Sequence, residues 1–364
     1  MKKKRHIYFF LPNFSIGGAG NSIFNICKQI KNASSSIKII SIGKNHYKKA
    51  FKEIGIKTIE LSNQKTIIAI FKIFFLMKKE LKEKEIIFVS NINYANVLSA
   101  IFLKNLTNLK LILIERTPFQ ELEIFFNFKD FIKKKIIYYL AKIFYKRADY
   151  IVGNSYAVSS YLESKINQKV LTKYPIIKIN KNIKKKYNKI LNISWIGRDS
   201  AEKNLNDFIR CLNLLKNREI IINIMTNKKI NNKMKNLIPK NFLKKINFYK
   251  FTNNQKIVNK IYNTTDIYIS TSVYEGFPNT VVEAVNNECL VISSKSFGGC
   301  REIIKNDKYG LLYTTYDYKQ LFKKIDYSLK NFNLCKKKIK FAKKNLQIKA
   351  IQNNSNYKKF FKSI

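Results

Sequence analysis

The sequence holds few of the residues that build metal sites, disulfide frameworks and histidine-based active sites. Among its 364 residues are five cysteines, and no two of them stand in a Cys-x-x-Cys spacing. Scattered cysteines in apolar stretches argue against a structural zinc site and indicate a reducing compartment. Two histidines are present, His6 before the first apolar run and His46 in a basic loop. Neither position is typical of a catalytic base, so we expect chemistry that does not depend on histidine.

Long apolar runs are also missing. No window reaches the roughly 18 consecutive apolar residues of a membrane-spanning helix. Residues 7–11 form a short apolar run, below the roughly 7 to 15 residues that a secretory signal needs, and they fit a first buried strand better. We therefore expect a cytoplasmic protein. With 46% hydrophobic residues, the chain is long enough to form two globular domains.

Acidic residues are scarce relative to basic ones. The chain has 23 Asp and Glu against 70 Lys and Arg, a formal net charge of +47. The lysines are spread over the whole chain, and we find no helix-turn-helix, zinc-finger or RNA-binding signature, so we expect no nucleic-acid partner. Anionic lipid attracts each nearby Lys or Arg by about 1 kcal/mol. The charge therefore favours a peripheral protein on the inner face of the cell membrane.

The most informative stretch is residues 270–303. A strand-like run at 266–270 ends in small hydroxyl residues, and a loop, a helix-like stretch, an apolar strand and a glycine pair follow. Two acids, Glu275 in the loop and Glu283 in the helix, stand eight positions apart. A carboxylate accepts two hydroxyl hydrogen bonds at once, so such a pair suits a polyhydroxylated ligand. Either acid alone would be read as an ordinary surface residue.

A second strand, glycine turn and helix lie at the start of the second half. Residues 193–196 are apolar, Gly197 follows, and Arg198 and Lys203 stand five positions apart around the turn. Arginine offers a planar fork and lysine a point charge, so the two can hold a diphosphate from two sides. Their place before a helix supports this interpretation, because helix N-termini favour anions.

A similar turn lies near the start of the chain. The run at 7–11 is followed by Gly17 and Gly18 and then by a helix pattern that begins at Asn21. Glycines there allow a close approach of the backbone to an anion. The spacing does not match Gly-x-Gly-x-x-Gly, so dinucleotide binding is not expected. Taken alone, the pattern is equally that of a simple turn.

Polar residues follow three further strands. Asn91 follows the run at 86–90, Glu115 and Arg116 follow 111–114, and Ser155 is an N-cap candidate after 150–153. Open α/β sheets bind ligands at the carboxyl ends of their strands, so we expect these residues near a sugar or acceptor. For Glu115 and Arg116 a structural role is an equal alternative.

Residues 119–147 interleave aromatic residues with basic ones. One interpretation is a pair of helices with a buried apolar face; the other is a patch that faces lipid head groups. The basic residues of that patch would be Lys133, Lys134, Lys135, Lys142, Lys146 and Arg147. The amphipathic stretch at 66–82 is a second candidate, although a helix packed on the sheet explains it more simply.

Glu275-Gly-Phe-Pro followed by Glu283-Ala resembles the signature of retaining GT-B glycosyltransferases of family 4, the group 1 transferases that build bacterial surface glycans and lipid-linked glycans. The resemblance implies that Glu275 lies near the sugar and phosphates of a nucleotide-sugar and that Glu283 binds its ribose. It also implies that Arg198 and Lys203 neutralise the diphosphate and that Glu275, Arg198 and Lys203 are the catalytic residues. The implied donor-binding residues are Gly17, Gly18, Gly197, Arg198, Lys203, Gly276, Phe277, Pro278, Asn279, Thr280 and Glu283.

The resemblance implies an α/β GT-B fold, two Rossmann-like domains facing a central cleft. We expect an N-terminal acceptor domain at 1–172, a linker at 173–190, a nucleotide-sugar domain at 191–345, and a helix at 346–364 that crosses back to the first domain. The enzyme would be a retaining hexosyltransferase that needs no metal and no cofactor; the chain has no evident Asp-x-Asp. Its donor would be a UDP-sugar and its acceptor a glycan, a polyprenyl-linked glycan or a lipopolysaccharide core.

Two alternatives remain at this point. A nucleotide-sugar epimerase or a sugar phosphorylase could have the same architecture. A non-enzymatic basic protein that binds polyanions or membranes is the other alternative, and it predicts steeply salt-dependent binding without nucleotide preference.

Overall fold

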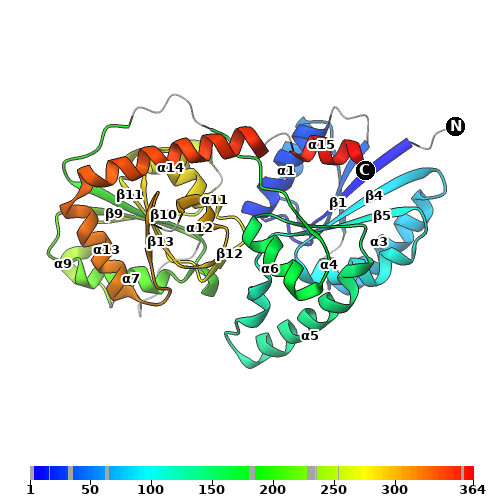
Figure 1. Cartoon of the computed structure of the whole chain (residues 1–364), viewed down its shortest axis with the longest axis horizontal. Helices are drawn as coiled ribbons and strands as arrows, with labels where there is room; N and C mark the ends of the chain where they lie inside the picture. The colour runs from blue at the N-terminus through cyan, green and yellow to red at the C-terminus, as the bar shows by residue number, and fades with distance from the viewer. Residues whose placement is uncertain are drawn as a thin grey trace. The chain divides into compact units, whose positions relative to one another are not determined.

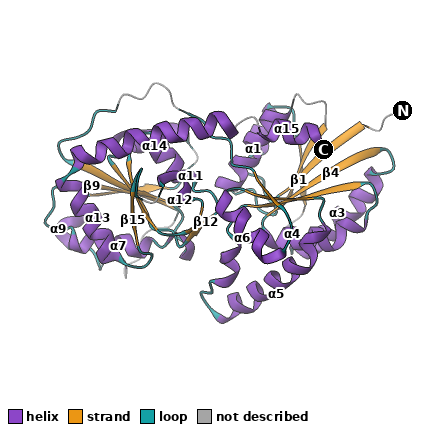
Figure 2. Cartoon of the chain, in the orientation of Figure 1, coloured by secondary structure: helices purple, strands orange, loops and turns teal. Residues whose placement is uncertain are grey.

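The computed structural model describes residues 4–15, 17–31, 36–61, 65–179, 185–227, 234, 236–252, 254–305, 307–353 and 356–364. The chain divides into two compact units, Met1–Ile176 with Gln352–Ile364 and Ile177–Ile351. Each unit is a parallel sheet with helices on both faces (Figures 1 and 2). This is the two-domain Rossmann-like architecture that the sequence predicts, and that prediction is confirmed.

The N-terminal unit is built on a seven-stranded parallel sheet in the order β3-β2-β1-β4-β5-β6-β7. Its strands are β1 Lys4–Phe10, β2 Ser36–Ile42, β3 Lys57–Leu61, β4 Lys84–Asn91, β5 Leu109–Glu115, β6 Tyr150–Gly153 and β7 Val170–Thr172. Helices cover both faces of this sheet, which is why the central strands are nearly continuous apolar runs. The chain order reverses between β1 and β4, and this reversal marks a topological switch point.

Two apolar cores lie on the two faces of the N-terminal sheet. One contains α3 Thr66–Glu80, α4 Asn93–Phe102, α5 Phe128–Phe144 and α6 Tyr156–Ile166. The other contains α1 Gly18–Ile30, α2 Lys48–Glu53 and α15 Asn356–Ser363. Short 3-10 turns lie at Leu103–Asn105, Phe119–Glu123 and Tyr145–Arg147. The end of the chain thus completes the core of the unit in which the chain begins.

The second unit has a six-stranded parallel sheet in the order β10-β9-β8-β11-β13-β15. Its strands are β8 Leu191–Ile196, β9 Ile220–Thr226, β10 Ile246–Lys250, β11 Ile267–Ser270, β13 Leu290–Ser294 and β15 Leu311–Tyr313. A separate two-stranded ribbon pairs β12 Tyr274–Glu275 with β14 Phe297–Gly298. Here the order reverses between β8 and β11.

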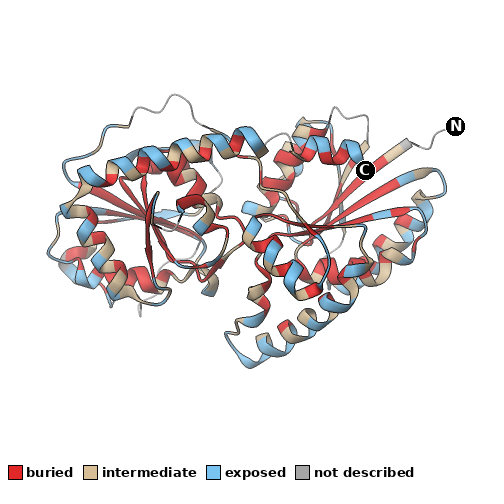
Figure 3. Ribbon diagram, viewed as in Figure 1, coloured by how far each residue is buried: buried red, intermediate tan, exposed pale blue. Residues whose placement is uncertain are grey.

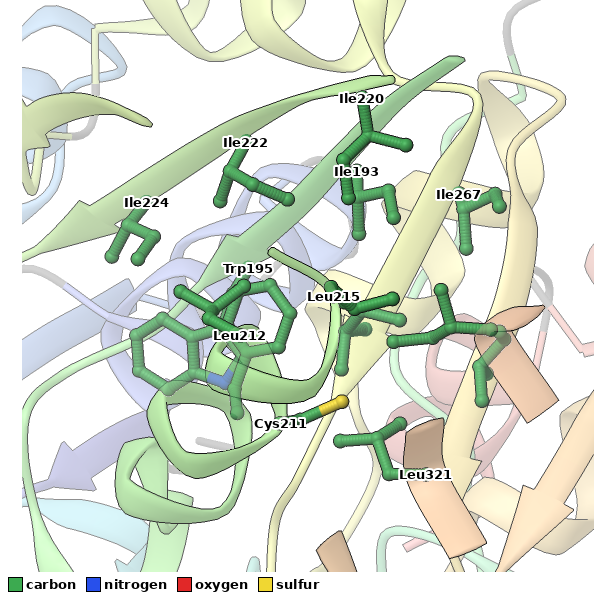
Figure 4. Close-up of a cluster of buried hydrophobic side chains, with 14 of the residues drawn as sticks. Ile193, Trp195, Cys211, Leu212, Leu215, Ile220, Ile222, Ile224, Ile267 and Leu321 are labelled. Atoms are coloured by element: carbon green, nitrogen blue, oxygen red, sulfur yellow. The ribbon is translucent and has the colours of Figure 1, made fainter. Parts of the chain in front are cut away.

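The helices of the second unit surround this sheet. Within the described residues they include the 3-10 turn Ala201–Lys203, α7 Leu205–Leu214, α9 Lys240–Leu243, α10 Gln255–Thr264, α11 Asn279–Asn286, α12 Cys300–Ile304, α13 Tyr318–Lys330 and α14 Phe332–Asn353. Figure 4 shows the core on one sheet face, where Ile193 and Trp195 of β8 lie near Leu212 of α7 and Leu321 of α13. This packing fixes the strand ends from which the functional loops leave.

The structure differs from the sequence prediction in the segment 119–147. The predicted pair of helices is a single long helix, α5, between the 3-10 turns Phe119–Glu123 and Tyr145–Arg147. The Asn127 side chain caps α5 by accepting a hydrogen bond of 2.9 Å from the backbone N–H of Asp130, so the helix begins at Phe128. The predicted linker at 173–190 includes residues 180–184, which lie outside the described residues. Its limits stay a prediction.

The helices in the part of the chain that the structure describes differ from membrane-spanning helices. None of the helices there combines the length and the apolar character needed to cross a bilayer.

We predict that Phe361→Ala destabilises the N-terminal unit by about 3–5 kcal/mol. The Phe361 side chain is 3% exposed and its ring centroid lies 5.8 Å from that of Phe9 in β1, so truncation leaves a cavity between α15 and the sheet. Ile351→Ala is the matched control, because Ile351 is 81% exposed and its loss should change stability by about 0.5 kcal/mol or less. Denaturant unfolding of both variants tests this; equal stability of the two would contradict it.

Candidate active site

The loop that carries Glu275 is held by the small β12–β14 ribbon. Glu275 pairs with Gly298 in this ribbon, and the backbone N–H of Gly299 donates to the carbonyls of Glu275 (3.2 Å) and Gly276 (3.0 Å). Gly298 has a φ of +104°, and a Cβ atom there would lie 1.6 Å from the Glu275 carbonyl oxygen. Only glycine fits such a position. The predicted glycine pair therefore locks the Glu275 loop in place.

Glu275 forms an ion pair with Lys203. The Lys203 ammonium contacts Glu275 Oε1, and the Ser272 hydroxyl donates to the same oxygen at 2.8 Å. The two charged side chains are 21% and 13% exposed, so the pair is largely shielded from water. The structure thus brings together two residues that the sequence predicts to share a site, although they are 72 positions apart.

Sheet topology explains this meeting. Lys203 follows β8 and Glu275 follows β11, and these two strands are neighbours at the point where the strand order reverses. Open α/β sheets bind ligands outside the carboxyl ends of the strands at such a switch point. The two loops are also joined directly, because the Thr271 hydroxyl donates to the Lys203 carbonyl at 2.7 Å. The Val273 N–H donates to the Glu202 carbonyl at 2.8 Å.

Arg198 lies in the same β8 loop but its side chain is more accessible. It is 53% exposed and forms an ion pair of 3.2 Å with Glu202, four positions along the chain. Exposed pairs of this kind contribute little, so the guanidinium can turn toward an anion at low cost. Gly197 holds the loop close to β8, since a Cβ atom there would lie 2.9 Å from the Trp195 ring.

Residues 276–278 lead into α11, which begins at Asn279. Phe277 is 6% exposed and packs inward, whereas Pro278 is the N-cap residue of the helix. The first backbone N–H groups of a helix have no partner within it, and its N-terminus favours negative charge. The predicted donor-binding residues Gly276, Asn279 and Thr280 thus surround a helix start beside the Glu275 loop.

Glu283 lies one turn further along α11. Burial raises the pKa of its carboxyl to about 7, and a hydrogen bond with the Tyr262 hydroxyl lowers that pKa in part. The Tyr262 hydroxyl donates its proton to the Thr280 carbonyl at 3.1 Å and so ties α11 to α10. Glu283 is therefore a shielded acid that changes charge near neutral pH, a property that sequence patterns do not reveal.

In the N-terminal unit, Asn91, Arg116 and Ser22 of α1 form one buried network. Arg116 donates from Nε to Asn91 Oδ1 and from Nη1 to the Ser22 hydroxyl, both at 2.9 Å. Asn91 in turn donates to the Phe10 carbonyl at 3.0 Å. Gly17 and Gly18, which begin α1, and Asn91, which ends β4, lie after the two strands that border this sheet's switch point.

Glu115 and Ser155 are buried. The Glu115 carboxylate is 1% exposed and accepts from Asn96 Nδ2 at 2.8 Å and from the Tyr145 hydroxyl. Burial raises its pKa to about 7. The Ser155 hydroxyl caps α6 by accepting from the Val158 N–H at 3.2 Å. Both side chains are engaged inside the unit, which favours the structural role that the sequence leaves open for Glu115.

Sequence reasoning misses three residues of the site in the second unit. Ser272 and Thr271 hold Glu275 and Lys203, and Tyr262 lies beside Glu283 and affects its pKa. The run of small hydroxyl residues after β11 is a signal for the first two. Tyr262 gives no signal, because it is an apolar-face residue of α10 whose hydroxyl partner becomes visible only in the structure. Among the described residues no group of three His, Cys, Asp or Glu side chains could hold a metal ion. Metal independence stays a prediction.

We predict that Gly298→Ala destabilises the second unit by about 3 kcal/mol or more, because the new Cβ atom would overlap the Glu275 carbonyl. Gly17→Ala is the control, since a Cβ atom at Gly17 meets no heavy atom within 4 Å. Thermal unfolding should show a large loss for the first variant and a small change for the second. A Gly298→Ala protein as stable as wild type would contradict the close approach of the two loops.

We predict that Glu283→Gln raises stability at pH 8 but not at pH 4. The folded-state pKa of about 7 exceeds the usual 4.5, so folding favours the protonated carboxyl. This contribution is complete below pH 4.5 and is lost as the pH rises through 7. Glutamine mimics the neutral acid, and the variant should exceed wild type by about 1–3 kcal/mol above pH 7. Unfolding free energies measured from pH 4 to pH 8 test this; a pH-independent difference would refute it.

The chain is similar to known glycosyltransferases. Residues 175–345 match the family model of the glycosyl transferases group 1. The chain is 25% identical over 358 residues to an alpha-1,4-N-acetyl-D-galactosaminyltransferase of Campylobacter jejuni, covering 93% of this chain and 92% of that protein. It is 30% identical over 196 residues to an uncharacterised glycosyltransferase of Methanocaldococcus jannaschii, 49% of this chain; the chain spans about half (47%) of that relative's length.

The fold is shared with a solved structure, that of HepE from Anabaena in complex with UDP and glucose. The TM-score is 0.77 at 16% sequence identity, over 99% of this chain and 100% of the other. The predicted family resemblance is thereby confirmed at the level of architecture and enzyme class. The chain has the GT-B fold, its residues 175–345 match the group 1 family model, and these findings support a glycosyltransferase.

Proposed function

We propose that this glycosyltransferase moves a hexose from a nucleotide-sugar, with UDP-sugar as the first candidate, to a glycan or lipid-linked acceptor in bacterial surface-glycan synthesis. Transfer would proceed with retention at the anomeric carbon and without a metal, as in the family 4 enzymes that the signature resembles. The observation that carries the proposal is the shielded Lys203–Glu275–Ser272 cluster at the switch point of the second sheet.

Lys203 and Arg198 are the cations proposed to stabilise the leaving nucleotide diphosphate. Breaking the sugar–phosphate bond places negative charge on the diphosphate, and fixed positive groups lower the energy of that state. Lys203 is preorganised, because its backbone is tied to Thr271 and its ammonium to Glu275. Arg198 is the exposed partner that can close on the diphosphate after the donor arrives.

Glu275 has two proposed roles. In the protein without donor it neutralises Lys203 and holds the ammonium in position. When the donor diphosphate contacts the Lys203 ammonium, Glu275 is no longer the only anion bonded to that ammonium. The Glu275 carboxylate can then accept hydrogen bonds from the sugar hydroxyls. Ser272 bonds to Oε1, so this oxygen stays fixed while the ion pair is exchanged.

Glu283 is proposed to bind the ribose hydroxyls. An ionised carboxylate is the stronger acceptor for two hydroxyls, and the pKa near 7 means that the free protein is only partly ionised at neutral pH. Nucleotide affinity should therefore be higher above pH 7 than below it. The N-terminus of α11 would add backbone donors for the phosphates.

The acceptor is proposed to meet the N-terminal unit at its own switch point, near Gly17, Gly18 and Asn91. Arg116 holds this region together by donating hydrogen bonds to both Asn91 and Ser22. The Campylobacter jejuni relative acts on a glycan attached to PP-undecaprenol, which supports a lipid-linked acceptor. HepE was solved with UDP and glucose, which supports UDP as the donor nucleotide. We propose that the protein acts in the cytoplasm, as a peripheral protein on the inner face of the cell membrane.

A thermal-shift panel tests the donor assignment. UDP, GDP, ADP and CMP are added without metal to wild type, to Glu283→Ala and to Glu219→Ala, a control at an exposed acid of the same unit. A ligand at about 100 times its dissociation constant adds about 2.7 kcal/mol of stability, so the true nucleotide should stand out. We expect selective stabilisation by UDP that is lost in Glu283→Ala and kept in Glu219→Ala.

Two other results would change the proposal. Equal shifts with every nucleotide that vanish in high salt would mean that net charge alone binds them, and the polyanion-binding alternative would then be favoured. Selective stabilisation that persists in Glu283→Ala would refute the ribose assignment while leaving the donor site intact.

A further inference from the structure

The outward face of α5 is apolar, although helices on the surface of globular proteins normally present polar residues to water. Five large side chains there are about half exposed or more: Phe128 74%, Ile132 45%, Ile136 54%, Tyr139 58% and Ile143 53%. Their spacing of four, four, three and four residues places them along one side of the helix. We call this row the α5 stripe. It does not contribute to the core of the unit.

The opposite side of α5 already packs on the N-terminal unit. Ala141 is fully buried there, and Ile137 and Leu140 pack against the core on that face of the sheet. The helix is therefore apolar on two sides, one of which faces the protein and the other the solvent. Exposed apolar rows of this size mark interaction surfaces in soluble proteins.

Lysines border the α5 stripe on both sides. At 100° per residue, Lys129 and Lys133 lie along one edge and Lys142 along the other, and all three are exposed. The one acidic residue of α5, Asp130, pairs with the inward-facing Lys134 at 3.0 Å. The outward face of α5 thus combines apolar residues at its centre with positive charge at its edges.

A second helix extends this surface. α3 exposes Ile67, Ile68, Phe71 and Phe75, and it lies on the same sheet face as α4 and α5. The Phe71 ring contacts Phe102 of α4 with centroids 4.7 Å apart, so α3 is joined to the helix between them. Figure 3 shows exposed residues along the outer sides of α3 and α5.

We infer that the α5 stripe, with α3 beside it, is the face by which the protein binds an anionic phospholipid surface. An interfacial helix buries its apolar row at the level of the head groups while bordering lysines contact lipid phosphates. A second copy of the chain fits less well, because pairing two stripes would bring two rows of lysines together in a protein of net charge +47. Nucleic acid fits less well, because the apolar centre of this face offers no contacts to phosphates.

This inference deepens the proposed function, because a lipid-linked acceptor would be presented at such a surface. It adds an orientation: the helical layer of α3, α4 and α5 faces the lipid, and the opposite layer of α1, α2 and α15 faces away from it. The claim concerns the N-terminal unit alone and does not depend on which nucleotide or sugar is used.

Vesicle sedimentation tests the inference on the full chain. The lipids are phosphatidylcholine alone and phosphatidylcholine with phosphatidylglycerol. We expect wild type to sediment with the anionic vesicles and the triple variant Ile132→Ser, Ile136→Ser, Ile143→Ser to bind at least about tenfold more weakly. The matched control, Leu334→Ser, Phe341→Ser, Ile348→Ser, removes three exposed apolar residues from α14 and should bind as wild type does.

A second triple variant, Lys129→Gln, Lys133→Gln, Lys142→Gln, tests the contribution of the lysines that border the α5 stripe. Each lysine near anionic lipid contributes about fivefold, so binding to phosphatidylglycerol vesicles should fall by about 100-fold. Insertion of the α5 stripe into the lipid is measured by the tryptophan fluorescence of the variant Ile136→Trp. The chain has one native tryptophan, Trp195, which is 2% exposed, so brominated lipid should quench the new residue and leave the native one unaffected.

Three results would overturn the inference. They are unchanged binding of the α5 triple variant, equal loss in the α14 control, and a wild-type dimer without lipid that the α5 substitutions dissociate in analytical ultracentrifugation. Thermal shifts with UDP separate this test from the proposed function. Both triple variants should keep the wild-type nucleotide response, so absence of any nucleotide response would refute the donor assignment while the lipid result stands.

Discussion

The ion pair between Lys203 and Glu275 is the interaction on which the candidate site depends. Two neighbouring strands at the switch point bring these residues together, and the fold supplies the rest of their surroundings. The Gly298 contact fixes the backbone of Glu275, and Thr271 fixes that of Lys203. A cation that binds diphosphate must be held without being permanently neutralised. A partly shielded carboxylate with a second, fixed hydrogen-bond donor meets both requirements.

Buried acids in this chain show that local burial outweighs the field of a very basic protein. A net charge of +47 should favour ionised carboxylates everywhere, yet burial raises the pKa of Glu115 and Glu283 to about 7 and that of Asp207 to about 6. Surface lysines act through water and salt, which screen them over about a nanometre. The loss of water around a buried carboxylate acts at contact distance and is not screened.

The fold and the elements of the donor loops could be predicted from the sequence, because strand, glycine turn and helix recur there with clear apolar runs. The surroundings of Glu115 could not. Residues alternate between the two faces of a strand, and Leu111 and Leu113 face one core while Ile112 and Ile114 face the other. Both faces of β5 are apolar, so the pattern gives no sign that Glu115 continues the first set and turns inward toward Tyr145. The exposed side of α5 was equally ambiguous, since a helix that is apolar on two sides does not show which of them is buried.

The division of the chain has a consequence for the order in which it folds during synthesis. The N-terminal unit includes residues 352–364, and Tyr357, Phe360 and Phe361 of α15 belong to the core that β1 and α1 begin. The ribosome delivers these residues only after the whole of Ile177–Ile351. The second unit is thus the first whose residues are all available, although domains usually fold in the order of their synthesis. Until residues 352–364 have been made, the part of this sheet face that α15 covers lacks that helix.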